Sequence, residues 1–355
     1  PQINGNVEIG SFMVAAAKHC LSRASELQVQ VMAQIIGAIG DAKCHTQCND
    51  MIVLFAQGVV HQLQNCLASD LSCALTALSK CNWKDMSVIL KIVKSITPMT
   101  MPQWPPDDLA IVCKALSDMN FRQNKVFYQQ VSFLMVERIE RFSLANIATI
   151  VLSMALLDVV ENDDLLSVIV EFCPTRLNEC HSTSGKKPLA DLLVAFGHLR
   201  VRADKFIDKV LKFLTPPKME ACQLSRGLQA LAALDYKEDE RWLKVCTEYV
   251  TTHIVDFTPS DLSKILYSIG ELGVKDQIFF GKIAIKIKNE LDSIEPADVT
   301  NVLFAAGQVD FKNPSWLKVI TDHVVENIDK FSTTQISEII FAVGYELSFT
   351  NQDLL

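Results

Sequence analysis

The chain has 355 residues, of which 49% are hydrophobic and 21% are charged, with 33 lysines and arginines against 41 aspartates and glutamates. This composition supplies ample apolar side chains for a core and excludes an intrinsically disordered chain. The apolar stretches fall short of the roughly 20 residues that a membrane helix needs. The net charge of −8 is opposite in sign to the basic footprint that usually accompanies phosphate contact. We expect a folded protein with no membrane span.

Cysteine usage and the two chain ends give the remaining general expectations. The eleven cysteines are scattered, and some, such as Cys113 and Cys246, fall within apolar patterns. This usage favours a reducing compartment over a disulfide framework. The chain begins at Pro1 and stops at Leu355 partway through a repeat. We therefore expect a segment of a longer polypeptide, from which any targeting peptide is missing.

One short pattern recurs along the whole chain at a spacing of about 38 residues. It is clearest at Leu262, Ile265, Leu266, Ser268 and Gly270, where three apolar side chains precede a small residue and a closing Gly, Ala or Ser. The residues equivalent to Gly270 are Gly40, Ser79, Ser117, Ala155, Gly197, Ala232, Gly307 and Gly344. Such repetition predicts an all-α fold, an α-solenoid of about nine helix-turn-helix repeats. We expect residues 1–355 to form a single repeat array without an internal domain boundary.

The first four repeats show how each first helix is expected to end. Asn82, Asn120 and Asp158 follow their pattern in the position of Gly273, as Asp235 and Asp310 do in later repeats, and these residue types suit a helix exit or turn. In the first repeat, Cys44, His45 and Cys48 stand close together. A structural zinc site would need a matched second pair of ligands nearby, so we expect no metal here.

The middle of the chain departs most from the pattern and then becomes basic. The step from Ala155 to Gly197 is 42 residues, the longest in the chain. Within it, Cys173, Cys180 and His181 form a second incomplete ligand set. The basic stretch that follows is the best candidate for phosphate contact, with a plain solvated face as the alternative. It comprises Lys186, Lys187, Arg200, Arg202, Lys205 and Lys209, together with Arg226.

The later repeats carry the strongest helix signals. Thr258 to Asp261 reads as a helix start with a hydroxyl cap, a proline at the first position and an acid in the first turn. Ser332 to Gln335 reads as a capping box. Trp242 and Trp316 fall at the start of the second helix of their repeats, where we expect them to anchor the core between repeats.

Two columns of the repeat contain only small side chains. The column of Ser268 reads Ala38, Ala77, Ala115, Ser153, Ala195, Ala230, Ser268, Ala305 and Ala342. The column of Ser263 reads Ala33, Ser72, Ala110, Ala148, Ala190, Ser225, Ser263, Thr300 and Ser337. Small residues on both flanks of the apolar stripe predict a close approach of neighbouring first helices.

Two columns opposite the apolar stripe vary freely and would line an inner groove. The column of Lys264 reads Gln34, Cys73, Ile111, Thr149, Asp191, Arg226, Lys264, Asn301 and Glu338. The column of Tyr267 reads Gly37, Thr76, Lys114, Leu152, Val194, Gln229, Tyr267, Phe304 and Phe341. A rigid frame with one variable residue per unit is how modular helical repeats contact single-stranded RNA, and simple drift of exposed positions is the alternative. The candidate RNA-binding residues are Arg200, Arg226, Gln229, Lys264, Tyr267, Asn301 and Phe304.

The repeats at Pro259 to Gly273 and Gln335 to Gly344 resemble the octotricopeptide and heptatricopeptide repeats of organellar RNA-binding proteins. They are also similar to the helical region of FAST-kinase-like and RAP-domain proteins. The resemblance covers nearly the whole chain and is strongest from Leu224 onward. It implies a paired-helix solenoid in mitochondria or chloroplasts that binds, processes or stabilises RNA, in a class with members embedded in mitochondrial ribosomes.

Two functions follow from these patterns. The first is a non-catalytic RNA-binding protein in a large ribonucleoprotein such as the mitochondrial ribosome, with single-stranded or ribosomal RNA and other subunits as partners. No glycine-rich phosphate loop or catalytic triad pattern is present, so we expect no enzyme activity, cofactor, metal or small-molecule substrate. We expect it in mitochondria, with another organelle of endosymbiotic origin as the alternative. The second function is a protein scaffold whose inner groove holds a peptide or partner subunit, which dominance of Asp191, Glu271 and Glu338 would favour.

Overall fold

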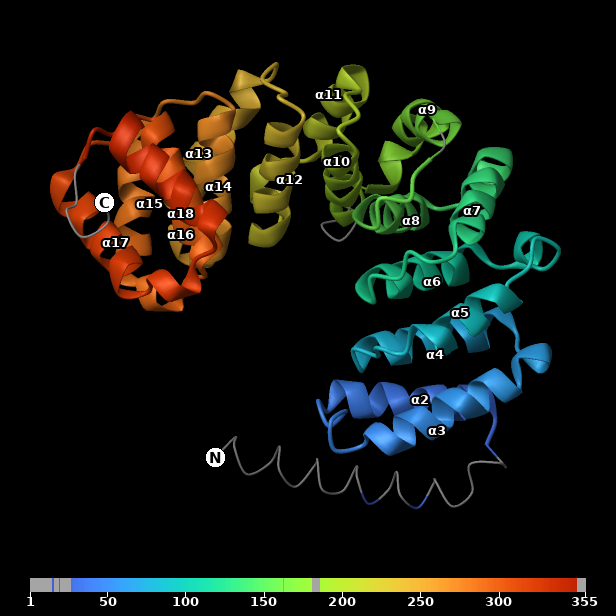
Figure 1. Cartoon of the computed structure of the whole chain (residues 1–355). Helices are drawn as coiled ribbons and strands as arrows, with labels where there is room; N and C mark the ends of the chain where they lie inside the picture. The colour runs from blue at the N-terminus through green and yellow to red at the C-terminus, as the bar shows by residue number, and fades with distance from the viewer. Residues whose placement is uncertain (1–14, 16–18, 20–26, 162, 181–185, 350–355) are drawn as a thin grey trace. The chain divides into compact units, whose positions relative to one another are not determined.

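The computed structural model describes residues 15, 19, 27–161, 163–180 and 186–349, and these are helical with no strand among them. The predicted all-α solenoid of paired helices is confirmed (Figure 1). The first helices of the repeats are α2 (Val29–Asp41), α4 (Ala68–Lys80), α6 (Pro106–Asp118), α8 (Leu144–Leu156), α10 (Lys187–Leu199), α12 (Ala221–Ala233), α14 (Pro259–Glu271), α16 (Pro296–Gln308) and α18 (Thr333–Ile340). The second helices are α3 (Asn49–His61), α5 (Met86–Ser95), α7 (Lys125–Arg138), α9 (Asp163–Phe172), α11 (Asp204–Phe213), α13 (Glu240–Thr252), α15 (Gln277–Asn289) and α17 (Pro314–Glu326).

Short 3₁₀ segments complete the repeats that have a second helix. A 3₁₀ segment follows each second helix: η2 (Leu63–Asn65), η3 (Met101–Gln103), η4 (Ile139–Arg141), η5 (Cys173–Cys180), η7 (Pro216–Lys218), η8 (Ile254–Asp256), η9 (Leu291–Ser293) and η10 (Ile328–Lys330). In the last repeat, α18 continues directly into the π-helix η11 (Phe341–Glu346). This wider turn was not expected from the sequence.

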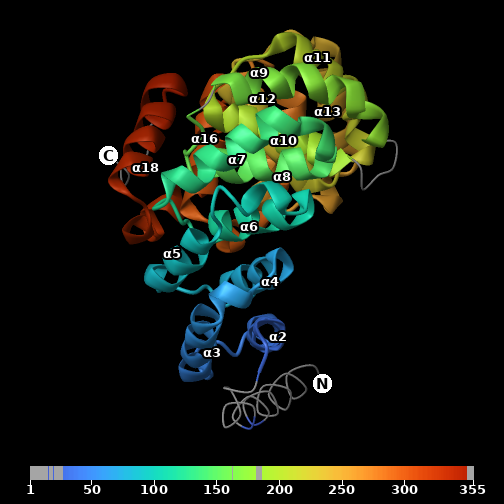
Figure 2. The same cartoon turned by 90° about the vertical axis from the view of Figure 1, so that its right-hand side faces the viewer.

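The chain divides into two compact units, Pro1–Cys173 (unit 1) and Pro174–Leu355 (unit 2). Within unit 1, the first helices pack in the order α2, α4, α6 and α8, and within unit 2 in the order α10, α12, α14, α16 and α18. Second helices pack on one another in the same way, as α3 does on α5 and α15 on α17. Figure 2 shows α2 beside α4 from a second direction. One array over the whole chain stays a prediction.

Each first helix from α2 to α16 is followed by a left-handed residue in the position that the sequence marked with Gly273. Gly273 has φ 81°, and the equivalent Asn120 and Asp310 have φ 54° and 55°. The following backbone N–H reaches back into the helix, as Val274 N does to Ile269 O at 3.1 Å. This hydrogen bond satisfies a carbonyl that the helix end would otherwise leave unpaired. The prediction is confirmed for Asn82, Asn120, Asp158, Asp235, Gly273 and Asp310.

The two small-residue columns lie between neighbouring first helices, as predicted. Both are buried except at their ends, where Ala38 and Ser337 are exposed. A Cβ atom on Gly197 would lie 2.7 Å from the Ala230 Cα atom of the next repeat, so the two backbones are almost in contact there. Two serines of the Ser263 column also donate to an aspartate of the following repeat. Ser72 Oγ lies 2.7 Å from Asp108 Oδ1, and Ser225 Oγ lies 2.9 Å from Asp261 Oδ1.

The predicted anchors and caps are confirmed. Trp242 donates its indole N–H to Leu214 O at 2.7 Å, and Trp316 donates to Ala284 O at 3.0 Å. Each bond reaches into the preceding repeat, and both rings are buried. Thr258 accepts from Asp261 N at 3.1 Å, and Ser332 forms the expected capping box. Local sequence patterns therefore specify both the helix starts and the contacts between repeats.

Candidate functional site

The variable columns of unit 2 lie together on the exposed side of its first-helix layer, which we call the unit 2 first-helix face. Arg226, Gln229, Lys264, Asn301 and the two predicted aromatic residues are half-buried on this face. The face comprises Asp191, Val194, Arg226, Gln229, Lys264, Tyr267, Asn301, Phe304, Glu338 and Phe341. The structure therefore brings together six of the seven candidate residues that the sequence indicated.

Arg200 is the exception among the seven. It is the left-handed residue that ends α10, with φ 53°, and so occupies the helix exit instead of a variable column. Its side chain is exposed at the C-terminal end of α10. The sequence did not reveal this placement because most of the other helix exits use glycine, asparagine or aspartate, which adopt this backbone more readily than arginine, although Lys43 is also left-handed at the end of α2.

Other members of the predicted basic stretch have their charges engaged within the fold. Lys186 is only 5% exposed and donates to Phe213 O at 2.7 Å. Arg202 donates to Asp204 Oδ1 at 2.7 Å and to Glu238 Oε1 at 2.9 Å. Lys205 and Lys209 lie on α11, in the layer of second helices. The stretch does not form one phosphate-binding surface.

Arg226 lies in a pocket of about 230 Å³ on the unit 2 first-helix face, where small and apolar residues surround three polar side chains. His198 and Gln229 share the pocket, which is lined by Val194, Gly197, His198, Arg226, Gln229, Ala230 and Ala233. The Arg226 Nη1 atom is 3.8 Å from Asp191 Oδ1, longer than a hydrogen bond, and the arginine side chain is 42% exposed. An anion in this pocket could therefore reach the guanidinium.

Lys264 continues the basic part of the face on α14, one repeat after Arg226. Within the described parts of the chain, no carboxylate lies within ion-pair distance of its ammonium group. Asp298 on α16 is the acid whose pKa Lys264 affects. Burial raises the pKa of Asp298, while a hydrogen bond with Ser260 and the Lys264 charge act in the opposite direction. The ammonium group of Lys264 thus remains available to a ligand.

Four aromatic side chains, Tyr267, Phe304, Phe341 and Tyr345, form what we call the aromatic strip on α14, α16 and η11. The Tyr267 and Phe304 rings are 5.4 Å apart between centroids, and the Phe341 and Tyr345 rings are stacked at 5.1 Å. Phe341 is 49% exposed and Tyr345 is 76% exposed. Phe341 stands in the same column of the repeat as Tyr267, whereas Tyr345 lies outside that column and was not predicted from the sequence. The π-helix η11 contains both residues of this stacked pair.

Carboxylates accompany the aromatic strip. Burial raises the pKa of Tyr267, and the nearby charges of Glu271 and Glu338 raise it further. Burial likewise raises the pKa of Glu346, with an added contribution from Glu271. The Glu346 Oε2 atom is buried and accepts no hydrogen bond. Because α16, α18 and η11 contain no lysine or arginine, this part of the face is acidic and aromatic.

The first-helix face of unit 1 carries smaller side chains than that of unit 2, and its net charge is closer to zero. It holds a pocket of about 470 Å³ lined by Ala33, Gln34, Gly37, Ala38, Asp41, Ser72, Cys73, Thr76, Ala77, Lys80 and Ile111. Its lysines are paired: Lys80 Nζ lies 2.9 Å from Asp41 Oδ2, and Lys114 Nζ lies 2.7 Å from Asp118 Oδ2. Both cations of this face therefore have a carboxylate partner already.

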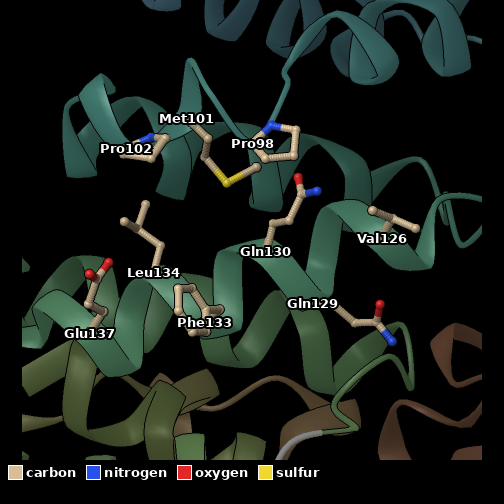
Figure 3. Close-up of a pocket in the computed structure, with 9 residues that line it drawn as sticks. All are labelled: Pro98, Met101, Pro102, Val126, Gln129, Gln130, Phe133, Leu134 and Glu137. Atoms are coloured by element: carbon tan, nitrogen blue, oxygen red, sulfur yellow. The ribbon is translucent and has the colours of Figure 1, made fainter.

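An apolar pocket of about 390 Å³ lies elsewhere in unit 1, between η3 and α7 (Figure 3). Phe133 and Val126 project from α7 with 66% and 58% exposure. Glu137 is the one charged residue in a lining of Pro98, Met101, Pro102, Val126, Gln129, Gln130, Phe133, Leu134 and Glu137. Without a cation in its lining, the pocket does not fit a phosphate backbone.

Neither cysteine cluster that the sequence pointed out provides a metal site in the described residues. Cys44 and Cys48 are buried, and Cys44 Sγ donates to Ala42 O at 3.2 Å. His181 of the second cluster lies outside the described residues. Over the described ranges, no group of three or more His, Cys, Asp or Glu side chains is arranged to hold a metal ion. No helix there is long and apolar enough to cross a membrane.

Residues 175–355 match the family model described as RNA-editing substrate-binding complex 6 protein. The chain belongs to this family. The matched segment makes up just over half of the chain and coincides with unit 2. No curated protein matches the chain in a sequence comparison. Membership of the RNA-editing substrate-binding complex 6 family agrees with a helical-repeat protein of an RNA-related complex, while the finer resemblance to octotricopeptide and RAP-domain proteins stays a prediction.

The RNA-editing substrate-binding complex 6 match and the charged first-helix face fall in the same half of the molecule. Arg226, Lys264 and the aromatic strip all lie inside the matched residues. The neutral face of unit 1 and the apolar pocket beside α7 lie outside them. Unit 2 is therefore where a function shared with this family should be sought.

Proposed function

We propose that the chain is a non-catalytic RNA-binding subunit of a mitochondrial RNA-editing complex, and that RNA contacts Arg226, Gln229, Lys264 and Asn301. The observation that carries the proposal is the state of the cations on the two first-helix faces. Arg226 of unit 2 has only a long ion pair of 3.8 Å with Asp191, and Lys264 forms no ion pair among the described residues, whereas Lys80 and Lys114 of unit 1 are paired closely at 2.9 and 2.7 Å.

The four side chains would contact different parts of the RNA, according to their chemistry. A guanidinium and an ammonium group suit phosphate oxygens, because hydrogen bonds between charged groups are stronger than neutral ones. The amides of Gln229 and Asn301 can donate to and accept from the edges of unpaired bases. Only two cations contact the backbone in this arrangement, so the affinity of the isolated chain should be low. Neighbouring subunits of the complex would supply the rest.

The family match favours an RNA-editing complex over the mitochondrial ribosome that the resemblance suggested. A mitochondrial location is part of the proposal, since the printed family description names RNA editing but no compartment. We propose no enzymatic step, cofactor or metal, and we propose single-stranded RNA and other complex subunits as the partners. Membership of the octotricopeptide class is retained as a further expectation.

The scaffold function remains a second candidate because of one observation. The part of the unit 2 first-helix face on α14, α16, α18 and η11 carries the aromatic strip with Glu271, Glu338 and Glu346, and only Lys264 as a cation. Carboxylates repel phosphates, so this part of the face suits a protein better than RNA. The two candidates then apply to two parts of one face.

In-cell ultraviolet crosslinking of the tagged full-length protein tests the RNA proposal. Attached RNA would be sequenced, the crosslinked peptides mapped, and copurifying proteins identified after nuclease treatment. Discrete RNA sites crosslinked to peptides of α12, α14 or α16 support RNA binding by this face. A nuclease-resistant protein assembly with no crosslinked RNA on unit 2 would overturn it.

A further inference from the structure

We infer that the aromatic strip (Tyr267, Phe304, Phe341 and Tyr345), together with Glu271 and Glu338, binds an arginine-bearing segment of another protein. This site adjoins the proposed RNA contacts but does not depend on them, since its recognition chemistry is of opposite charge. The inference assigns a protein partner to the acidic part of the unit 2 first-helix face.

The exposure of the strip is the first argument. Phe341 and Tyr345 are 49% and 76% exposed and stack on each other at 5.1 Å. Large aromatic rings on a folded surface leave apolar area in water, which a partner can cover. Since Tyr267 and Phe304 lie in the same column at 5.4 Å from each other, the ring faces extend over three successive repeats.

The π-helix is the second argument. Tyr345 occupies the repeat position that Glu271 and Gln308 occupy in the two preceding repeats. It lies within the π-helix η11, which spans Phe341–Glu346. A single wide turn of this kind is rare and is frequent at functional sites. It also moves the left-handed exit of the last repeat by one residue, to Ser348. The last repeat departs from the common pattern at the residues that carry the stacked ring pair.

The charges around the strip decide the class of partner. Glu271 accepts a hydrogen bond from Gln308 Nε2 at 2.5 Å, and no lysine or arginine forms an ion pair with Glu271, Glu338 or Glu346 in the described parts of unit 2. The first helices from α14 onward supply Lys264 as their single cation, against Asp261, Glu271, Asp298, Glu338 and Glu346 in the same helices. A cationic partner would restore the balance of charge.

Arginine fits this combination better than lysine or a nucleotide does. Its planar guanidinium stacks on aromatic faces while its N–H groups donate to carboxylates in the same plane. A base could stack on the same rings, but the phosphates attached to it would face Glu271 and Glu338 with Lys264 as the single cation of these first helices. The ring and carboxylate arrangement thus selects for a positively charged protein segment.

The test uses the full chain and a defined peptide probe. A fluorescent Gly/Ser peptide containing three spaced arginines is titrated with the protein, and fluorescence anisotropy reports binding. The control peptide carries citrulline at the same places, which keeps the planar shape but removes the charge. We expect the citrulline peptide to bind about tenfold more weakly, since cation–π contacts and carboxylate pairing are both lost.

Variants locate the binding site. Phe341→Ala combined with Tyr345→Ala should weaken binding of the arginine peptide about tenfold, because two exposed ring faces are removed. Glu338→Gln, a change at an exposed position, should weaken it severalfold and reduce its salt dependence. Phe133→Ala is the matched control, since it removes an equally exposed ring from the pocket of unit 1. Circular dichroism melting confirms that each variant is folded.

Two results would overturn the inference. One is equal binding of the arginine and citrulline peptides, or unchanged arginine binding by the Phe341→Ala, Tyr345→Ala protein. The other is a loss of oligouridine binding, without any loss of peptide binding, in that same double variant, which would make the strip an RNA surface. Oligouridine binding that depends on Arg226 and Lys264, and not on the aromatic strip, is compatible with the inference. Failure of the protein-binding inference can therefore be distinguished from failure of the RNA proposal.

Discussion

The first-helix faces of units 1 and 2 share one backbone frame and differ in chemistry. In both units, the small-residue columns are buried and a serine donates to an aspartate of the next repeat, at 2.7 Å for Ser72 and 2.9 Å for Ser225. The face of unit 1 pairs its lysines closely with carboxylates, whereas in unit 2 Arg226 has only the 3.8 Å ion pair with Asp191, Lys264 has none among the described residues, and the aromatic strip is added. The frame determines where residues lie, and the variable columns determine what they bind.

The comparison also separates stability from function. A change in the shared frame should affect folding in either unit, in proportion to how tightly neighbouring first helices meet at that position. A change in the variable columns should affect ligand binding in unit 2 with little effect on folding.

The largest stability effect is expected from Ala305→Phe. Ala305 is fully buried between first helices, and a phenyl ring there overpacks the contact by about 1–3 kcal/mol. The matched control is Ala38→Phe, in the same column of the first repeat, where the residue is exposed. We expect thermal melting to show a lower midpoint for the first variant only. Equal midpoints for wild type and Ala305→Phe would count against close helix packing.

The next effect is expected from Gly197→Ala. A Cβ atom there would lie 2.7 Å from Ala230 Cα and 3.2 Å from Ala230 O, so the backbones must separate, at a cost of up to about 2 kcal/mol. Gly344→Ala is the control in the same column, since its Cβ would meet nothing within 4 Å. That variant should be neutral or slightly stabilising, because alanine favours a helix over glycine. Destabilisation of both variants to the same extent in urea unfolding would refute the steric explanation.

A smaller effect is expected when the serine bond between repeats is removed. Ser225→Ala loses its hydrogen bond to Asp261, and Ser72→Ala loses its bond to Asp108, each at about 0.5–1.5 kcal/mol. Because the frame is shared, the two losses should agree closely when urea unfolding of the two variants is compared. A clear loss in one unit and none in the other would show that the frames differ.

The smallest effect is a gain from Glu346→Gln. The folded protein raises the pKa of Glu346 by burial and by the charge of Glu271, so the native carboxyl holds its proton more tightly than the unfolded one. The wild type therefore loses stability as pH rises between the ordinary pKa and the raised one. We expect Glu346→Gln to raise the melting temperature at pH 7. The gain in free energy of unfolding should be at most about 0.5 kcal/mol, because Glu346 is partly exposed. The gain should vanish at pH 4, and its persistence there would contradict the proposed cause.

Local patterns predicted the frame well, for a physical reason. The helix start at Thr258, the exit at Gly273 and the small residue at Ser268 each reflect a requirement of nearby backbone, which a short stretch of sequence records. The anchoring of Trp242 and Trp316 followed from their place at the start of a second helix. Repetition reinforced each of these signals, because the same steric demand recurs in every repeat.

The chemistry of the faces was harder to predict, because it depends on residues far apart in sequence. Lys186 is buried and donates to Phe213 O, and Arg202 donates to Glu238. These contacts join residues from different elements, so the basic stretch in the sequence did not reveal them. Arg200 occupies a left-handed exit that its residue type does not signal. The π-helix that includes Tyr345 is a departure within an otherwise regular repeat, which a periodic pattern does not anticipate. The boundary between the units fell in the segment where the repeat pattern was weakest.

The most direct test of the account is a matched charge reversal in the two units. Arg226→Glu with Lys264→Glu is compared with Lys80→Glu and Lys114→Glu, and the affinity of each full-length protein for fluorescent oligouridine is measured over a series of salt concentrations. We expect the unit 2 pair to bind at least about tenfold more weakly, with a salt slope lower by roughly 1–2, because two phosphate contacts are lost. The unit 1 pair should bind like the wild type. Equal losses in both variants, or full binding by the unit 2 variant, would contradict RNA binding by the unit 2 first-helix face.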